Sequence, residues 1–134
     1  MRHRLLVVDD DDRLRGAYRH HFSSAGFQVR TAASLAEACA ELVKHTFDAI
    51  IVDVSLSHGG IEGLMFAGEC RGRRRARPAL VLTAYGAPAH APAAARLGVD
   101  VFLHKPASLV WLERLLRARI EGRHRAAYAT ARAG

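Results

Sequence analysis

The sequence predicts an α/β domain in which a doubly wound parallel sheet of five strands alternates with five helices. Three observations predict it. Five strand-like segments alternate with segments of helical period, and four of the five are short apolar runs. Such runs lack a polar face, which is typical of strands buried on both sides. The length of 134 residues, half of them hydrophobic, fits one domain with a proper core. Strict alternation favours a doubly wound sheet over a sandwich or a helical bundle.

The first strand is predicted at residues 4–8, where the aliphatic run RLLVV ends at Asp9. The next segment changes period, because its apolar residues recur at intervals of three and four. This pattern predicts a helix over residues 11–25. Gly26 is placed to end that helix in a left-handed cap.

A second strand is indicated by the alternation of apolar and polar residues over 27–31. Ser34 and Glu37 then have the spacing of a capping box, in which each side chain accepts from the other's backbone amide. They predict a second helix over residues 35–45. The third strand follows at residues 47–52.

The second half of the chain repeats the alternation. The third strand ends at Asp53, a third helix is predicted over 62–71, and a fourth strand over 79–82. Pro88 or Pro92 can occupy the first turn of a fourth helix, which Gly98 would end.

The fifth strand is predicted at residues 101–104, and Ser108 is placed to cap a fifth helix. That helix has one apolar face, formed by Leu109, Leu112, Leu116 and Ile120.

Composition limits the kind of protein. No apolar run approaches the ~20 residues of a membrane span, so we expect a cytoplasmic location and no membrane partner.

Cys39 and Cys70 lack metal-ligand spacing and suggest two buried or half-buried free thiols. The net charge of +7 reflects arginines concentrated in residues 71–77 and 114–132. Because no aromatic interleaving accompanies them, direct nucleic-acid binding is not expected.

Polar residues close four of the predicted strands. Asp9 and Asp10 follow the first, Asp53 the third, Thr83 the fourth and Lys105 the fifth. The carboxyl ends of parallel strands meet at one edge of the sheet. Clustered carboxylates there suit Mg²⁺, and the separate Asp53 is placed to attack phosphorus as a nucleophile. Thr83 and Lys105 would supply the donors that a transferring phosphoryl group needs.

The motifs LLVVDD, IIVDV, LVLTA and HKP, in this order, resemble the strand-end motifs of the response regulator receiver domain of two-component signalling. The resemblance covers residues 1–121 and leaves 122–134 as a short basic C-terminal tail. It implies a flavodoxin-like fold with strand order 2-1-3-4-5. In that order the first and third strands are neighbours at the topological switch point.

The resemblance also implies roles for the strand-end residues. Asp53 would accept the phosphoryl group from a phosphohistidine on a sensor histidine kinase or phosphotransfer protein, and would also ligate Mg²⁺. Asp10 would bind Mg²⁺ directly, Asp9 through water, and Ser55 through its main-chain carbonyl. Lys105 would pair with the phosphoryl oxygens.

For output, the resemblance implies a switch in which Thr83 moves toward the phosphoryl group and Phe102 turns inward. The signalling surface would be the face of the fourth helix, fifth strand and fifth helix, where Trp111 and Leu115 are candidates for a partner or homodimer contact or for the edge of the core. The protein would be no enzyme beyond its own phosphorylation and slow dephosphorylation, which Tyr85 would slow further by shielding the phosphate.

The sequence departs from the family pattern in the loop after Asp53. Ser57 stands where the family usually has a proline, and this loop is longer by about two residues.

We favour a stand-alone receiver that acts through protein contacts or phosphate relay. The alternative is the receiver of a longer DNA-binding regulator or hybrid kinase. An aspartate-nucleophile phosphatase fits less well, because Asp53 has no acid two residues later. A nucleic-acid-binding module would rest on the arginine clusters alone.

Overall fold

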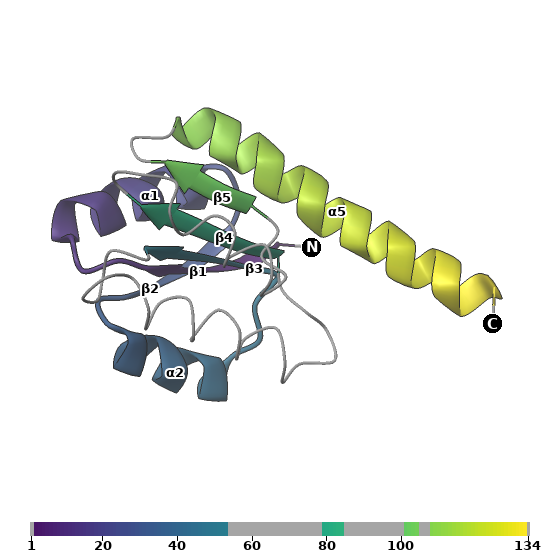
Figure 1. Cartoon of the computed structure of the whole chain (residues 1–134), viewed down its shortest axis with the longest axis horizontal. Helices are drawn as coiled ribbons and strands as arrows, with labels where there is room; N and C mark the ends of the chain where they lie inside the picture. The colour runs from purple at the N-terminus through teal and green to yellow at the C-terminus, as the bar shows by residue number, and fades with distance from the viewer. Residues whose placement is uncertain (1, 54–78, 85–100, 105–107, 134) are drawn as a thin grey trace.

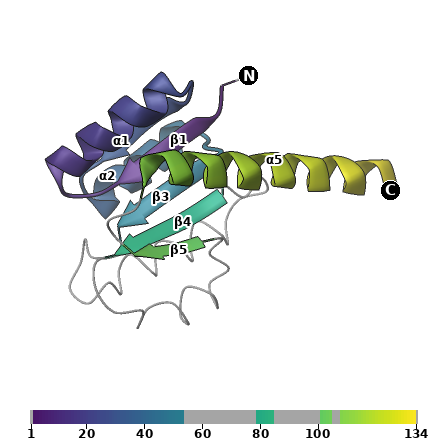
Figure 2. The same ribbon diagram turned by 90° about the horizontal axis from the view of Figure 1, so that it is seen from above.

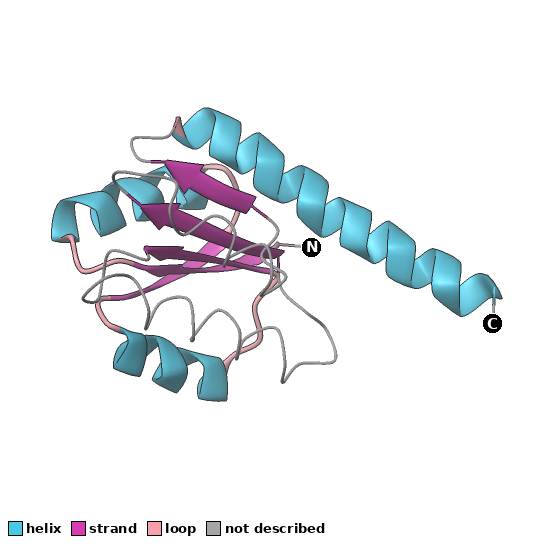
Figure 3. Ribbon diagram, viewed as in Figure 1, coloured by secondary structure: helices cyan, strands magenta, loops and turns pink. Residues whose placement is uncertain are grey.

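The computed structural model describes residues 2–53, 79–84, 101–104 and 108–133. Five strands and three helices lie within them (Figures 1 and 3). In chain order they are β1 (Arg4–Val8), α1 (Asp12–Ser24), β2 (Gln28–Ala32), α2 (Leu35–Lys44), β3 (Ala49–Asp53), β4 (Ala79–Ala84), β5 (Val101–His104) and α5 (Leu109–Ala133). The helices predicted at 62–71 and after Pro88 lie outside the described residues.

The five strands form one parallel sheet in the order β2-β1-β3-β4-β5, which confirms the predicted topology. The third strand begins two residues later than predicted, and the fourth continues to Ala84, so that Thr83 lies inside it. Because β1 lies between β2 and β3, the chain reverses its direction of winding there. The ends of β1 and β3 are therefore adjacent.

Helices cover both faces of the sheet, as Figures 1 and 2 show. α1 and α5 lie against one face, and α2 lies against the other. The strands β1 and β3 are buried over almost their whole length, as the unbroken apolar runs in the sequence predict. Successive side chains of a strand point to opposite faces, so each of these strands supplies two cores.

A core of buried apolar residues lies between the sheet and the pair α1 and α5. The apolar stripe predicted for α5 belongs to it, apart from Leu109, which packs against its edge. Off that stripe, Trp111 is 51% exposed and Leu115 is half-buried. The cluster consists of Leu5, Val7, Tyr18, Phe22, Phe27, Ala49, Ile51, Leu112, Leu116 and Ile120.

The end of α1 confirms the predicted glycine cap. Gly26 has a φ of 97°, and its N–H donates to the carbonyl of Ser23, while the N–H of Phe27 donates to that of Phe22. These two bonds form a Schellman motif. The rings of Phe22 and Phe27 meet edge to face with centroids 5.2 Å apart, so apolar packing also stabilises the turn from α1 into β2.

The start of α2 follows the predicted capping box in part. The hydroxyl of Ser34 accepts from the N–H of Glu37 at 3.2 Å. The carboxylate of Glu37, however, accepts from the N–H of Ala33 at 2.6 Å, one residue before the predicted partner. On the same helix the thiol of Cys39 is free, as predicted, but it is exposed, so the prediction of a buried or half-buried thiol was wrong there. Cys70 lies outside the described residues.

The last helix, α5, begins at Leu109 and continues to Ala133, through the segment predicted as a tail. Its start lies near the carboxyl ends of the strands, and its C-terminal half runs past their amino ends (Figures 1 and 2). Among the residues that the structure describes, no helix is both long and apolar enough to cross a membrane.

A polar brace joins α5 to the end of α1. The carboxylate of Glu113 accepts from Nε of Arg117 at 3.1 Å and lies 3.0 Å from Nε2 of His21. Arg117 also donates to the carbonyl of Ala25 and lies over the ring of Phe27, 4.8 Å from its centroid. Burial raises the pKa of Glu113, but the hydrogen bonds from Arg117 and His21 outweigh it and hold the pKa below its ordinary value.

The lowered pKa of Glu113 predicts how its contribution to stability depends on pH. The ionised carboxylate stabilises the fold above its unfolded pKa of about 4.3, and this contribution is lost as pH falls through the lower folded pKa. We therefore expect Glu113→Gln to lower the free energy of unfolding at pH 7 by at most about 1 kcal/mol. The deficit should shrink below pH 4 in urea unfolding. Glu121→Gln, an exposed change on the same helix, is the control. A deficit for Glu113→Gln that does not change with pH would contradict the assignment.

Candidate functional site

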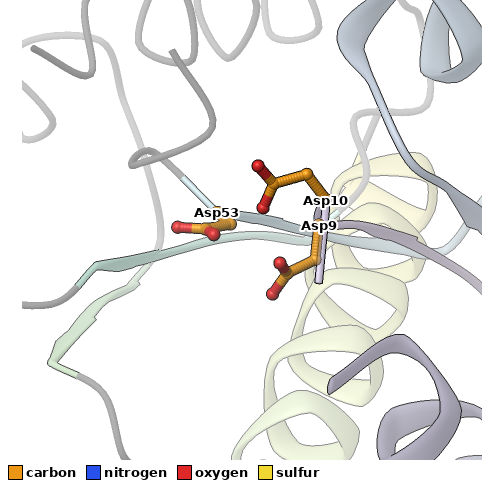
Figure 4. Close-up of side chains that lie close together, drawn as sticks. All are labelled: Asp9, Asp10 and Asp53. Carbon is orange, nitrogen blue, oxygen red and sulfur yellow. The ribbon is translucent and has the colours of Figure 1, made fainter. Parts of the chain in front are cut away.

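Three carboxylates meet at the carboxyl edge of the sheet (Figure 4). Asp9 and Asp10 follow β1, and Asp53 is the last residue of β3. Their ligand oxygens all lie within 4.8 Å of one another. Asp9 and Asp53 are almost fully buried, with 2% and 4% exposure, whereas Asp10 is exposed. We call these three residues the acidic cluster. Their predicted convergence is confirmed.

The register of the sheet explains this convergence. Val8 of β1 pairs with Val52 of β3, so the residues that follow them reach the same level of the sheet. On the far side of β3, Asp53 pairs with Thr83 of β4. The backbone of Thr83 is therefore next to that of Asp53, where the sequence analysis requires it.

The turn after β1 is held by local hydrogen bonds. The N–H of Asp9 donates to the carbonyl of Ala32 at 3.0 Å, which adds one bond to the pairing of β1 with β2. Oδ1 of Asp9 accepts from the N–H of Asp11 at 3.0 Å. Asp11 in turn caps α1, because its carboxylate accepts from the N–H groups of Arg13 and Leu14. Hydrogen bonds thus join the end of β1, the turn and the start of α1.

The start of α1 also agrees with the charge pattern in the sequence. Asp11 is the N-cap and Asp12 lies in the first turn. Negative charge is favourable there because the helix dipole is positive at its N-terminus. The four consecutive aspartates therefore have two roles: Asp9 and Asp10 belong to the acidic cluster, and Asp11 and Asp12 stabilise the start of α1.

Other predicted site residues are less fully placed. Phe102 pairs with Leu82 in the backbone register of β5 and β4. Ser55, Ser57, Tyr85 and Lys105 lie outside the described residues. The roles predicted for Ser55, Phe102, Lys105 and the hydroxyl of Thr83 stay predictions.

The sequence analysis missed a residue beside the cluster. Arg15, on the first turns of α1, donates from Nη1 to the main-chain carbonyl of Asp9 at 2.7 Å and also pairs with Asp12. The one signal in the sequence was the spacing of three residues between Asp12 and Arg15, which puts opposite charges on one helix face. The contact back to the strand had no sequence signal.

The donor set of the acidic cluster fits Mg²⁺. This ion prefers carboxylate oxygens and commonly keeps several of its waters, so it needs only a few protein ligands. Three like charges within 4.8 Å repel one another, and a divalent cation among them would remove that repulsion. Since Asp10 is exposed, solvent reaches one member of the cluster. The arrangement is therefore suited to a partly hydrated ion.

Comparison with known proteins shows which family the chain resembles. A family model for the response regulator receiver domain matches residues 5–117. Among curated proteins, the chain is 33% identical over 110 residues to the transcriptional activator protein PfeR of Pseudomonas aeruginosa. It is 34% identical over 115 residues to the response regulator MprA of Mycobacterium tuberculosis. These matches cover 82% and 86% of this chain but only 35% and 49% of the two relatives.

Solved structures with this fold include chains that the present chain covers almost completely. A CheY-like receiver domain protein from Methanospirillum hungatei has a TM-score of 0.85 at 19% identity, covering 94% of this chain and 99% of that one. The chemotaxis response regulator CheY4 of Vibrio cholerae has a TM-score of 0.75 at 27% identity, covering 90% and 99%. The first likeness concerns the fold alone.

The repulsion within the acidic cluster predicts an unusual mutational effect. In EDTA, Asp10→Asn should raise the free energy of unfolding by about 1 kcal/mol, because it removes one of three like charges at an exposed position. Mg²⁺ should then stabilise the variant less than the wild type, as urea unfolding with and without the ion would reveal. Asp48→Asn, just before β3 at the opposite edge of the sheet, is the control and should keep the full response to Mg²⁺. A loss of stability in EDTA for Asp10→Asn would argue against repulsion in the cluster.

Proposed function

The chain belongs to the response regulator receiver family, and we propose that it accepts a phosphoryl group on Asp53 in a reaction that depends on Mg²⁺. The observation that carries this proposal is the acidic cluster. It brings a buried carboxylate at the end of β3 within 4.8 Å of two further carboxylates from the turn after β1. A receiver needs both a nucleophile and a metal site, and this edge of the sheet offers them together.

The chemistry assigned to Asp53 is a simple displacement. One carboxylate oxygen forms a bond to phosphorus, and the bond from phosphorus to the donor nitrogen or oxygen breaks. The leaving group takes the electron pair, and the product is an aspartyl phosphate. Phosphoryl transfer needs mainly positioning and charge stabilisation, so the protein's task is to hold the reacting groups in place.

The remaining residues would supply that charge stabilisation. Asp10 would bind Mg²⁺ directly, Asp9 would do so through water, and the carbonyl of Ser55 would complete the protein's ligands. Bound Mg²⁺ would neutralise charge on the phosphoryl oxygens. Thr83, next to Asp53 in the register, would donate a hydrogen bond to these oxygens, and Lys105 would pair with them.

The donor and the output follow from the family. We propose that a sensor histidine kinase or a phosphotransfer protein supplies the phosphoryl group in the cytoplasm. Phosphorylation would bias the domain toward an active arrangement through contacts available only there. The names of the two curated relatives describe a transcriptional activator and a response regulator, and both are longer than the matched region. The output would therefore be a partner protein or a further domain.

The start of α5 supports a contact surface for that output. Val110 and Trp111 are adjacent in the sequence and are 53% and 51% exposed, so two large apolar side chains are available to a partner there. Switching would involve Thr83 and Phe102, and the partner or a second copy would meet the face that includes β5 and α5. Slow dephosphorylation would follow if Tyr85 shields the phosphate.

Incubation with Mg²⁺ and a small acyl phosphate donor tests the proposed function. We expect the intact mass of the wild type to rise by one phosphoryl group that maps to Asp53. The label should be absent in EDTA and in Asp53→Asn. Asp48→Asn changes an aspartate at the other end of the same strand and should label normally. Equal labelling of wild type and Asp53→Asn, or no label on the wild type, would refute the proposal.

A further inference from the structure

We propose that Arg15 is a positioning residue for the acidic cluster, which it holds in the geometry that binds Mg²⁺. The inference rests on the proposed function, because it concerns the same metal site. Arg15 binds the end of β1 instead of extending into solvent. The side chain of Arg15 is only 18% exposed, whereas that of its partner Asp12 is 88% exposed.

The decisive contact is to the backbone. Nη1 of Arg15 donates to the main-chain oxygen of Asp9 at 2.7 Å. That oxygen belongs to the peptide group that joins Asp9 to Asp10, and a peptide group is planar. Holding this oxygen therefore restrains the orientation of the plane, and with it the direction in which Asp10 leaves the strand. Arg15 thus acts through the backbone on the carboxylates of Asp9 and Asp10.

The contact completes the anchoring of Asp9. The N–H of Asp9 is bound to the carbonyl of Ala32, and its Oδ1 accepts from the N–H of Asp11. The main-chain oxygen is the remaining polar backbone group, and Arg15 binds it. In metal sites, mutation of a partner that orients the ligands typically weakens metal binding by about 10- to 100-fold.

Arg15 could instead act on Mg²⁺ through its positive charge. A positive charge beside the site repels Mg²⁺, so replacing Arg15 would then strengthen Mg²⁺ binding instead of weakening it. The ion pair with Asp12 offsets part of the charge of Arg15 and so limits this effect. Weaker binding after removal of Arg15 would therefore report geometry and not charge.

The choice of arginine also has a physical reason. A guanidinium presents several donors in a fixed fork, so it can bind the carbonyl of Asp9 with one nitrogen and the carboxylate of Asp12 with another. A lysine carries the same charge on a single nitrogen without that planar fork. Arg15→Lys should consequently restore part of the affinity lost in Arg15→Ala.

Calorimetric titration with MgCl₂ tests the inference on the full chain. We expect wild type to bind one ion, Arg15→Ala to bind it about tenfold more weakly, and Arg15→Lys to lie between them. The matched control is Arg13→Ala, which removes an exposed arginine from the same turn of α1. It should leave the affinity unchanged or slightly tighter. In Mg²⁺-free NMR spectra, Arg15→Ala should shift the amide signals of Asp10 and Asp11 and leave that of Asp48 in place.

The outcomes separate the two proposals. If wild type binds Mg²⁺ and Arg15→Ala binds it equally well or more tightly, the role of Arg15 is overturned and the proposed function stands. If wild type binds no Mg²⁺, both are overturned. Should Arg15→Ala fail to fold in EDTA, Arg15→Lys decides: weaker binding than wild type supports the role, and equal binding overturns it.

Discussion

The pairing of β1 with β3 is the constraint on which the rest of the structure depends. Because Val8 is in register with Val52, the residues after β1 and the last residue of β3 reach one edge of the sheet together. The carboxylate of Asp53 then lies within 4.8 Å of those of Asp9 and Asp10, more than 40 residues earlier in the sequence. A shift of one residue in the pairing of β1 with β3 would turn the side chains of one strand to the opposite face of the sheet and separate the carboxylates of the cluster. The apolar runs that fix the register therefore also fix the site.

This arrangement places like charges in a largely buried position, which opposes folding unless a cation is bound. The scaffold compensates by holding the turn after β1 tightly. Ala32, Asp11 and Arg15 together bind the polar groups of Asp9. On the same face of the sheet, the brace of Glu113 and Arg117 ties α5 to the end of α1. The helix that carries Arg15 is thus fixed at both of its ends.

Much of the fold could be predicted because its signals are local. Apolar runs mark the strands, Gly26 marks the end of α1, and the order of polar strand ends indicates a single site. Contacts between distant segments had no such signal. His21 and Glu113 lie 92 residues apart, and nothing in either neighbourhood indicates the other. Arg15 looked like one arginine among many, since its bond to the carbonyl of Asp9 depends on how α1 packs on β1. Likewise, local propensity did not reveal that α5 continues through the predicted tail.

The most direct test of the central claim is to locate the metal site with Mn²⁺, which broadens the NMR signals of nearby nuclei. We expect trace Mn²⁺ to broaden the amide signals of the acidic cluster and of its neighbours at the ends of β1 and β3. Signals at the opposite edge, such as that of Asp48, should stay sharp, and excess Mg²⁺ should reverse the broadening. Broadening that spreads over surface acids, or that Mg²⁺ does not reverse, would contradict a single built site at the carboxyl edge of the sheet.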